Sequence, residues 1–285
     1  MIPSYIDIEA IFDHYDAVFF DAYGVLVDGI DALPNAEQLV NIMNASAMNY
    51  FIVTNDASKS IESLSNKFQS QGMRIPVERI VNSGSLISGY YRDEDLVGRP
   101  TLVLGTKDSR TYVSGSCAKI LSLDSNSEPD VILFTHSSPY DWESTLKHLL
   151  NLVSKRFKQK TPVRMVLPNT DFIYQDGKAD FGMGAAAFVE TLEEALMRLH
   201  GKHEVLRAAK LGKPHPPIFT EAILRAGSNN AIMIGDQLET DILGANNVGL
   251  DSAVVTTGIN KRSNPKEFKD MPDDLTPRYI LTSLV

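Results

Sequence analysis

The feature that most constrains the fold of this 285-residue chain is the alternation of short apolar, β-rich runs with amphipathic helical patterns. Residues 17–21 (AVFFD) and 50–54 (YFIVT) are typical of buried strands. Between them, apolar residues from Ala36 to Met43 repeat at the i, i+3, i+4, i+7 spacing of a helix. Such alternation predicts an α/β fold with a doubly wound parallel sheet.

The same alternation continues to the end of the chain. A long helix is expected between the strands at 130–136 and 163–169, with Trp142, Leu149 and Val153 on its buried face. Because no long polar linker divides the sequence, any second domain is expected to be inserted into the first. Further strands are expected at 101–105, 231–236 and 252–257, and further helices at about 60–71, 184–199, 216–226 and 239–247.

Composition excludes several classes of protein. Hydrophobic residues (43%) and charged residues (22%) have ordinary globular proportions, and no segment reaches the roughly 18 uncharged apolar residues of a membrane span. The net charge of −9 opposes non-specific nucleic-acid binding, which depends on neutralising phosphates. Cys117 is the only cysteine and has no metal-ligand spacing around it, so we expect an inert thiol in a reducing cytoplasm.

Polar residues stand where the first two predicted strands end. Asp21 closes the first strand, and Gly24 follows three residues later, where the backbone must turn. Thr54 and Asn55 stand at the same end of the second strand, where a hydroxyl and an adjacent N–H can hold phosphate oxygens. Open α/β sheets bind their ligands at this edge. A single Asp at a strand end is more often a turn former or helix cap.

Two further stretches extend the pattern. Lys213 stands in a Gly-Lys-Pro sequence, which taken alone is usually a turn. Asp236 ends another buried strand, and Asp241 follows about one helical turn into the next helix. Since all four stretches lie at the carboxyl ends of separate strands, or on the loops after them, the order predicts one site of three carboxylates, a lysine and a Thr-Asn pair.

These stretches resemble a known family. "DAYGVLVDG", "VTNDASKS", "GKPHPPIF" and "GDQLETDI" are similar to motifs one to four of the haloacid dehalogenase (HAD) superfamily of phosphohydrolases, in the order of its class IIA, NagD-like branch. "LPNTDFIYQDG" and "GMGAAAFVETLEEA" resemble the cap segment of that branch. The resemblance implies a Rossmannoid HAD-like core from residues 1–83 and 208–285, with an inserted α/β cap at 84–207. It also implies that the protein forms a homodimer through the cap.

The resemblance implies a reaction on a small phosphorylated metabolite, such as a sugar phosphate or a nucleotide. Asp21 would attack phosphorus to form an aspartyl-phosphate, which divides one difficult displacement into two. Lys213 would steady the nucleophile, while Thr54 and the N–H of Asn55 bind the phosphoryl group. The cap would select the substrate, with Asn169 and Asp171 near it.

A magnesium ion is the cofactor that the resemblance implies. Its ligands would be the carboxylates of Asp21 and Asp236 and the backbone carbonyl of Tyr23, with Asp241 at the edge of the metal site orienting a metal-bound water or Lys213.

One departure from the family leaves the activity open. Phosphatases of this family usually have Asp at the position of Tyr23, as acid and then base, and a phenol is a poor base at neutral pH. A slow phosphatase is one interpretation, in which Tyr23, a histidine such as His215 or a cap residue does this work. A phosphate-binding protein with little turnover is the second. A haloacid dehalogenase, which also has Asp-Ala-Tyr-Gly, is the third; Asp236 and Asp241 disfavour it because dehalogenation needs no metal.

Two other positions have a functional and a structural interpretation. Asp56 stands where the branch usually has Asn, and we expect it to be a solvated turn residue rather than a selector of cationic substrates. His136 follows a predicted cap strand, and a structural role is favoured over a catalytic one.

Overall fold

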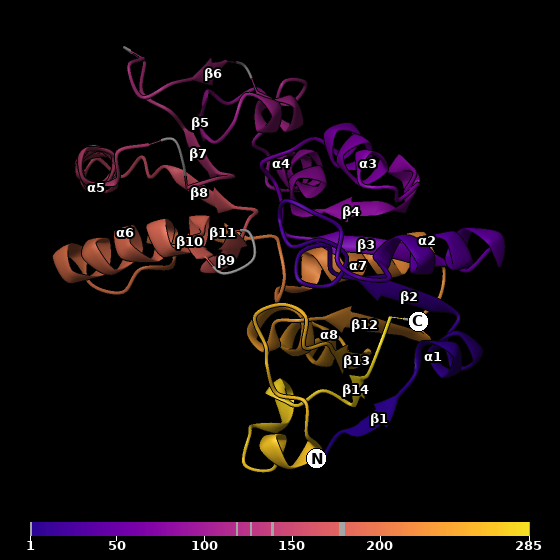
Figure 1. Cartoon of the computed structure of the whole chain (residues 1–285). Coiled ribbons are helices and arrows are strands. Elements are labelled where there is room, and N and C mark those ends of the chain that lie inside the picture. The colour runs from indigo at the N-terminus through magenta and orange to yellow at the C-terminus, as the bar shows by residue number, and fades with distance from the viewer. Residues whose placement is uncertain (1, 118, 126, 138–139, 177–179, 285) are drawn as a thin grey trace.

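Two parallel sheets, each covered by helices, organise the chain (Figure 1). The structure is a computed structural model that describes every residue except 1, 118, 126, 138–139, 177–179 and 285. The larger sheet has seven strands and lies beside the chain termini, and the second has five strands. Residues from both ends of the chain form the larger sheet, while the smaller one is built from the middle of the sequence.

The larger sheet has the strand order β1-β14-β13-β12-β2-β3-β4, and its paired strands are parallel. Side chains alternate between its two faces, so Phe20 packs with Leu39 on one face and Phe19 packs with Phe219 on the other. Helices cover both faces, as a doubly wound sheet requires. Its strands are β1 (Ser4–Ile6), β2 (Ala17–Phe20), β3 (Tyr50–Thr54), β4 (Ile80–Asn82), β12 (Ala231–Gly235), β13 (Asp251–Val254) and β14 (Tyr279–Leu281).

The helices that pack on the larger sheet divide between its two faces. Helices α1 (Ile8–His14), α2 (Ala36–Ala45) and α3 (Ile61–Ser70) contribute to the core on one face. Helices α7 (Pro216–Ala226) and α8 (Leu243–Asn247) contribute to the core on the other.

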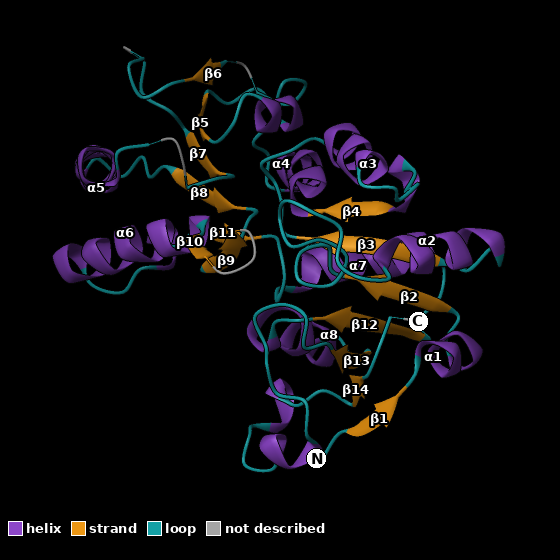
Figure 2. Ribbon diagram, viewed as in Figure 1, coloured by secondary structure: helices purple, strands orange, loops and turns teal. Residues whose placement is uncertain are grey.

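The smaller sheet has the order β11-β8-β7-β5-β6, also with parallel pairs (Figure 2). Helices α5 (Trp142–Lys158) and α6 (Ala185–His200) pack on one face, and α4 (Ile87–Asp93) packs on the other. As expected, Leu149 and Val153 of α5 are buried, and Trp142 packs edge-on against Phe188. The strands are β5 (Thr101–Leu104), β6 (Ile120–Leu121), β7 (Val131–Phe134), β8 (Arg164–Leu167) and β11 (Ala209–Lys210).

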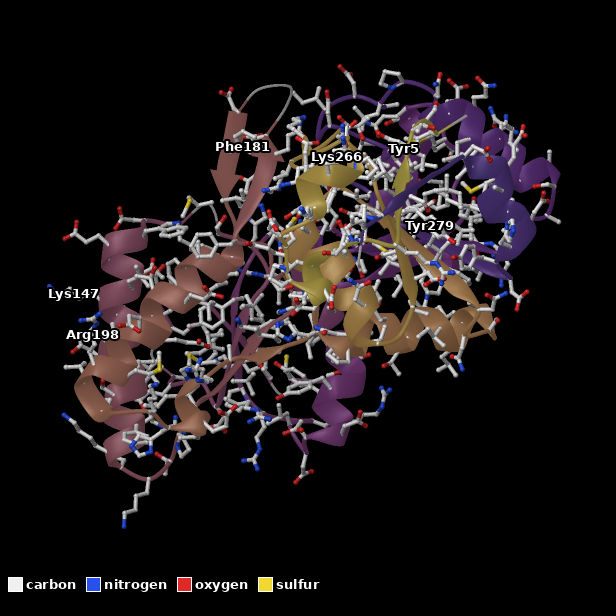
Figure 3. All side chains as sticks on the ribbon, turned by 90° about the horizontal axis from the view of Figure 1, so that it is seen from below. Tyr5, Lys147, Phe181, Arg198, Lys266 and Tyr279 are labelled. Atoms are coloured by element: carbon white, nitrogen blue, oxygen red, sulfur yellow. The ribbon has the colours of Figure 1, made fainter. Side chains whose placement is uncertain are left out.

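An antiparallel hairpin, β9 (Ile173–Asp176) and β10 (Asp180–Met183), connects β8 to α6. Figure 3 shows Phe181 on this hairpin, while Lys147 and Arg198 mark helices α5 and α6 at the far end of the smaller part. The sequence patterns did not indicate this hairpin.

The predicted α/β fold with parallel sheets is confirmed, and the expected strands and helices are present within a few residues of their predicted ends. The helix expected at 239–247 differs, since it opens with a π-helical turn, Leu238–Ile242, before α8. In this wide turn, the backbone N–H groups of Asp236 and Gln237 donate to the Asp241 carboxylate at 3.1 and 3.0 Å. Asp241 is therefore drawn back toward the end of β12.

The limits of the inserted cap, residues 84–207, stay a prediction. Strand β11 lies just beyond residue 207 and pairs with β8 of the smaller sheet. No helix within the described residues is long and apolar enough to cross a membrane.

Candidate active site

Three adjacent strands of the larger sheet end at the candidate site. Strand β2 lies between β12 and β3, so the residues that follow these strands meet at one edge. Asp21 follows β2, Thr54 ends β3, and Asp236 follows β12. All three are buried and line one cavity. The predicted convergence at the carboxyl edge is therefore present in the structure.

Lys213 joins two of the carboxylates. Its Nζ lies 2.7 Å from Asp21 Oδ1 and 2.7 Å from Asp241 Oδ1, and all three residues are buried. Burial alone would lower the pKa of Lys213, but the two carboxylates outweigh it and raise that pKa. Lys213 is thus a fixed ammonium that holds Asp21 in place.

Asp21, Asp236 and Asp241 form a buried acidic cluster in which one carboxylate oxygen from each residue lies within 4.8 Å of the other two. When all three carboxylates are ionised, the one ammonium of Lys213 leaves an excess of two negative charges. Burial and the Asp241 carboxylate raise the pKa of Asp236 to about 7. Asp236 Oδ1 is buried and has no hydrogen-bond partner among the described residues. An oxygen-rich cluster with this excess charge and an orphaned carboxylate oxygen fits a divalent cation such as Mg²⁺.

Glycine at position 24 lets the loop after Asp21 pass close to this cluster. Gly24 has a φ of +82°, and a Cβ atom there would lie 2.4 Å from Cγ of Asp236. Any larger residue would meet both backbone strain and overlap with Asp236. The turn predicted from the sequence therefore also makes room for a carboxylate.

The Asn55 side chain binds two segments that are distant from it in sequence. Its side-chain oxygen accepts from Lys213 N at 2.7 Å, while Nδ2 donates to Asp171 Oδ1 at 2.8 Å and to Thr170 Oγ1 at 3.1 Å. Thr54, beside it, is almost fully buried and lines the cavity. Asn55 therefore fixes the segment that follows β8 against the loop that carries Lys213.

The side chain of Tyr23 is held in a polar network. Its hydroxyl donates to Asp56 Oδ2 at 2.7 Å, and Lys67 Nζ donates to that hydroxyl at 3.3 Å and lies 4.7 Å from the ring centroid. Burial, then Asp56, raises the pKa of Tyr23 well above its usual value. The phenol is therefore neutral, and its proton points to Asp56.

Asp56 is not the solvated turn residue that we expected. It is buried and also accepts from Ser58 N at 2.9 Å, the Ser58 hydroxyl and Lys59 Nζ at 3.2 Å. Although burial opposes the charge, Lys59 and these hydrogen bonds lower the pKa of Asp56. Its carboxylate is a fully partnered acceptor.

The cavity above Asp21 has a volume of about 270 Å³ and lies between the two sheet-bearing parts. Its walls on the side of the smaller sheet are mostly polar: His136, Ser137, Asn169, Asp171, Gln175 and Asp176. Asn169 and Asp171 are therefore close to the site, as the resemblance implied. His136, for which a structural role was favoured, also lines the cavity.

His215 proves a poor candidate for the missing acid and base. It lies at the start of α7 and lines a second groove, together with Lys210 and Glu190. Among the described residues that line the cavity above Asp21, His215 does not occur. Its position close to Lys213 in sequence does not bring it into the lining of the cavity above Asp21.

Lys59 and Lys67 also line the cavity, and the sequence analysis did not select them. Lys67 lies on α3, donates to the Gly29 carbonyl at 2.9 Å and is half-buried. Its place four residues before the end of a predicted helix carries no signal that separates it from a solvated lysine.

Two protein-family models match the chain. A family model described as haloacid dehalogenase-like hydrolase matches residues 18–116, and one described as HAD-hydrolase-like matches residues 210–284. The chain belongs to the haloacid dehalogenase-like hydrolases. The two matched segments contain Asp21, Thr54, Lys213 and Asp236, so they include the residues that meet at the sheet edge.

Several relatives are similar over most of their length. A structure from Cytophaga hutchinsonii, described as a possible sugar phosphatase, is 28% identical with a TM-score of 0.83, covering 99% of each chain. Glycerol phosphate phosphatase from Mycobacterium tuberculosis, solved with magnesium, is 24% identical with a TM-score of 0.77, covering 96% of this chain and 77% of that one. Dihydroxyacetone phosphatase of Corynebacterium glutamicum is 22% identical, covering 93% of this chain and 87% of the relative.

Proposed function

We propose that the protein is a Mg²⁺-dependent phosphatase that hydrolyses a small phosphorylated metabolite through an aspartyl-phosphate on Asp21. The observation that carries the proposal is the geometry at the sheet edge, where Lys213 lies 2.7 Å from Asp21 and from Asp241 beside the buried Asp236. The names of the relatives support it, since they include dihydroxyacetone phosphatase and glycerol phosphate phosphatase.

Asp21 is the nucleophile of this proposal. One of its oxygens attacks phosphorus, the bond from phosphorus to the leaving oxygen breaks, and an acyl-phosphate results. Lys213 holds the carboxylate in a fixed orientation and offsets charge on the transferring oxygens. In this proposal the Thr54 hydroxyl and the N–H of Asn55 would bind the phosphoryl group.

Asp21, Asp236 and the carbonyl of Tyr23 would hold Mg²⁺, with Asp241 at the edge of the metal site. Both oxygens of Asp241 already accept hydrogen bonds, one from Lys213 and one from the amides of Asp236 and Gln237. Asp241 therefore orients Lys213 more directly than it offers a ligand. When bound, the cation supplies the charge that offsets repulsion between the Asp21 carboxylate and a phosphate dianion.

The cavity favours a small polar substrate. At about 270 Å³ it accepts a molecule the size of a triose or hexose phosphate, and hydroxyl groups would find the side chains of Ser137, Asn169 and Gln175 on its wall.

The test is a time course of phosphate release from an aryl phosphate and from a panel of triose, hexose and nucleoside phosphates, with Mg²⁺ or with EDTA. Steady release that requires Mg²⁺ is expected, and Asp21→Asn should abolish it. Asp13→Asn, which changes an exposed carboxylate on α1, is the matched control and should leave the rate unchanged. Release that persists in Asp21→Asn would refute the nucleophile assignment.

The binding-protein and dehalogenase interpretations predict different results. A phosphate-binding protein would give protein-bound phosphate without turnover, because the Tyr23 hydroxyl is committed to Asp56. A dehalogenase would release halide from a 2-haloacid in the presence of EDTA.

A further inference from the structure

Hydrolysis of an alkyl phosphate at this site needs a proton donor that Tyr23 does not supply. An alkoxide is a poor leaving group unless it is protonated as it departs, and the water that follows must lose a proton to a base. The Tyr23 hydroxyl donates its hydrogen bond to Asp56 Oδ2 at 2.7 Å. The group that moves the proton must therefore be another side chain on the cavity wall.

Most carboxylates at the cavity are already committed. Asp21 and Asp241 are bound to Lys213, and Asp236 belongs to the same buried cluster. Asp56 accepts hydrogen bonds from Tyr23, from Ser58 twice and from Lys59. Of the carboxylates on described residues that line the cavity, this leaves Asp171 and Asp176.

Asp171 is held rigidly, whereas Asp176 is exposed on the hairpin. The Asp171 carbonyl accepts from Ala186 N at 3.2 Å at the start of α6. Gly184 packs so closely against it that a Cβ there would lie 1.9 Å from that carbonyl oxygen. Helix α6 and the preceding glycine therefore fix the backbone from which Asp171 reaches into the cavity.

The two carboxylate oxygens of Asp171 have different surroundings. Oδ1 accepts from Asn55 Nδ2 at 2.8 Å, and Asn55 is the neighbour of Thr54 at the phosphate end of the cavity. Oδ2 accepts no hydrogen bond from any described residue. One oxygen is thus anchored beside the phosphoryl site, and the other is left for a substrate group.

We propose that Asp171 is the acid and base of the reaction. This catalytic carboxyl group follows strand β8 of the smaller sheet, and it takes the role that an Asp at the position of Tyr23 has in other phosphatases of the family. The inference rests on the phosphatase function proposed above. In the first step, Asp21 forms its bond to phosphorus, the bond to the alkoxide oxygen breaks, and that oxygen takes the proton of the Asp171 carboxyl. In the second, water attacks phosphorus, its proton passes to the Asp171 carboxylate, and the bond to Asp21 breaks to give inorganic phosphate.

The surroundings of Asp171 suit this exchange. Burial has the largest effect on the pKa of Asp171 and raises it. Lys213 and the Asn55 amide lower this pKa, whereas the charges of Asp241 and Asp56 raise it further. Together they raise the pKa of Asp171 to about 6. About one molecule in ten would then carry the proton at pH 7, and the ionised form remains available as base.

The test compares two leaving groups in Asp171→Asn, which keeps the oxygen that faces Asn55. Glycerol phosphate releases an alkoxide, whereas p-nitrophenyl phosphate releases an anion that needs no proton. We expect kcat/KM to fall by about 10²–10⁴ for glycerol phosphate and by less than about tenfold for the aryl ester. With the aryl ester, one nitrophenolate per site should appear in a burst, followed by slow turnover from trapped acyl-phosphate.

Asp176→Asn is the matched control, since it makes the same change on the same cavity wall and should show no burst. Asp171→Glu keeps a carboxyl and should recover at least about tenfold of the alkyl rate. If Asp171→Asn unfolds at a clearly lower temperature than the unmodified chain, Asp171→Ala should give the same ratio of the alkyl-ester rate to the aryl-ester rate. Equal losses for both esters without a burst, or no loss for either, would overturn the inference. Failure of the unmodified chain to hydrolyse either ester would instead refute the proposed function.

Discussion

Replacing Tyr23 by Phe separates the structural use of the hydroxyl from a catalytic one. The change removes the hydrogen bond to Asp56 Oδ2 at 2.7 Å and the acceptor of Lys67 Nζ at 3.3 Å. A hydrogen bond to a charged group contributes about 1.5–3 kcal/mol to stability. Asp56 keeps Ser58 and Lys59 as donors, and Lys67 keeps the Gly29 carbonyl. Neither charge is left unpaired, so we expect a loss of about 1.5 kcal/mol.

That loss corresponds to a fall in Tm of about 3 °C for a chain of this length. Activity should respond less, because the proton of the hydroxyl faces Asp56 rather than the substrate. We expect kcat/KM for glycerol phosphate to remain within about fivefold of the unmodified value, against the 10²–10⁴ typical of a lost acid or base.

Thermal melts of Tyr23→Phe test the expected fall in Tm, and initial rates test the expected kcat/KM. Tyr5→Phe removes an exposed hydroxyl that donates to the Ser263 carbonyl, and as the control it should change neither Tm nor kcat/KM. A loss of kcat/KM of about 100-fold or more in Tyr23→Phe would show that the phenol moves the proton, and the assignment of that role to Asp171 would be wrong.

Three further results are expected. Tyr23→Asp should not raise turnover of alkyl phosphates, since it sets a second carboxylate beside Asp56. A tenfold gain would mean that no other group acts as acid and base in the unmodified chain. Asp171→Asn should melt higher than the unmodified chain above pH 6, where the folded state holds a desolvated carboxylate whose pKa is raised to about 6, and the difference should shrink below pH 6 and vanish below about pH 3, where the folded and unfolded states are both protonated; a difference that is constant with pH would contradict the assigned environment. Mg²⁺ should raise the Tm of the unmodified chain but not that of Asp236→Asn, as measured by thermal shift with and without EDTA; equal shifts would remove Asp236 from the metal site.

Much of the core could be predicted from the sequence because its signals are local. Buried parallel strands are short continuous apolar runs, so their length and β-rich composition indicate β2, β3 and β12. Since parallel strands present their carboxyl ends at one edge, residues that follow those strands meet there whatever the details of packing. This rule brought Asp21, Thr54 and Asp236 together correctly.

Contacts between distant segments could not be predicted in this way. Tyr23 and Asp56 are 33 residues apart, and Asn55 and Asp171 are 116 apart, so no periodic pattern joins them. Asp56 therefore looked like a solvated turn residue, although the fold buries it under Tyr23 and Lys59. Its burial follows from tertiary packing.

The choice of His215 failed for a related reason. Proximity to Lys213 in sequence suggested proximity in space, but His215 stands at the N-cap of α7 and lines another groove. The short hairpin of β9 and β10 was missed because its strands mix charged, polar and aromatic residues without an alternating pattern.

In the proposed reaction Asp21 becomes phosphorylated, and water then hydrolyses the acyl-phosphate. The most direct test of this reaction is a rapid-quench single turnover with ³²P-labelled glycerol phosphate and Mg²⁺, in which protein-bound label is located by peptide mass spectrometry. Label on Asp21 is expected to rise and then decay into inorganic phosphate, and Asp21→Asn is expected to carry no label. Release of phosphate with no labelled protein at any time, or label on a different residue, would contradict this reaction.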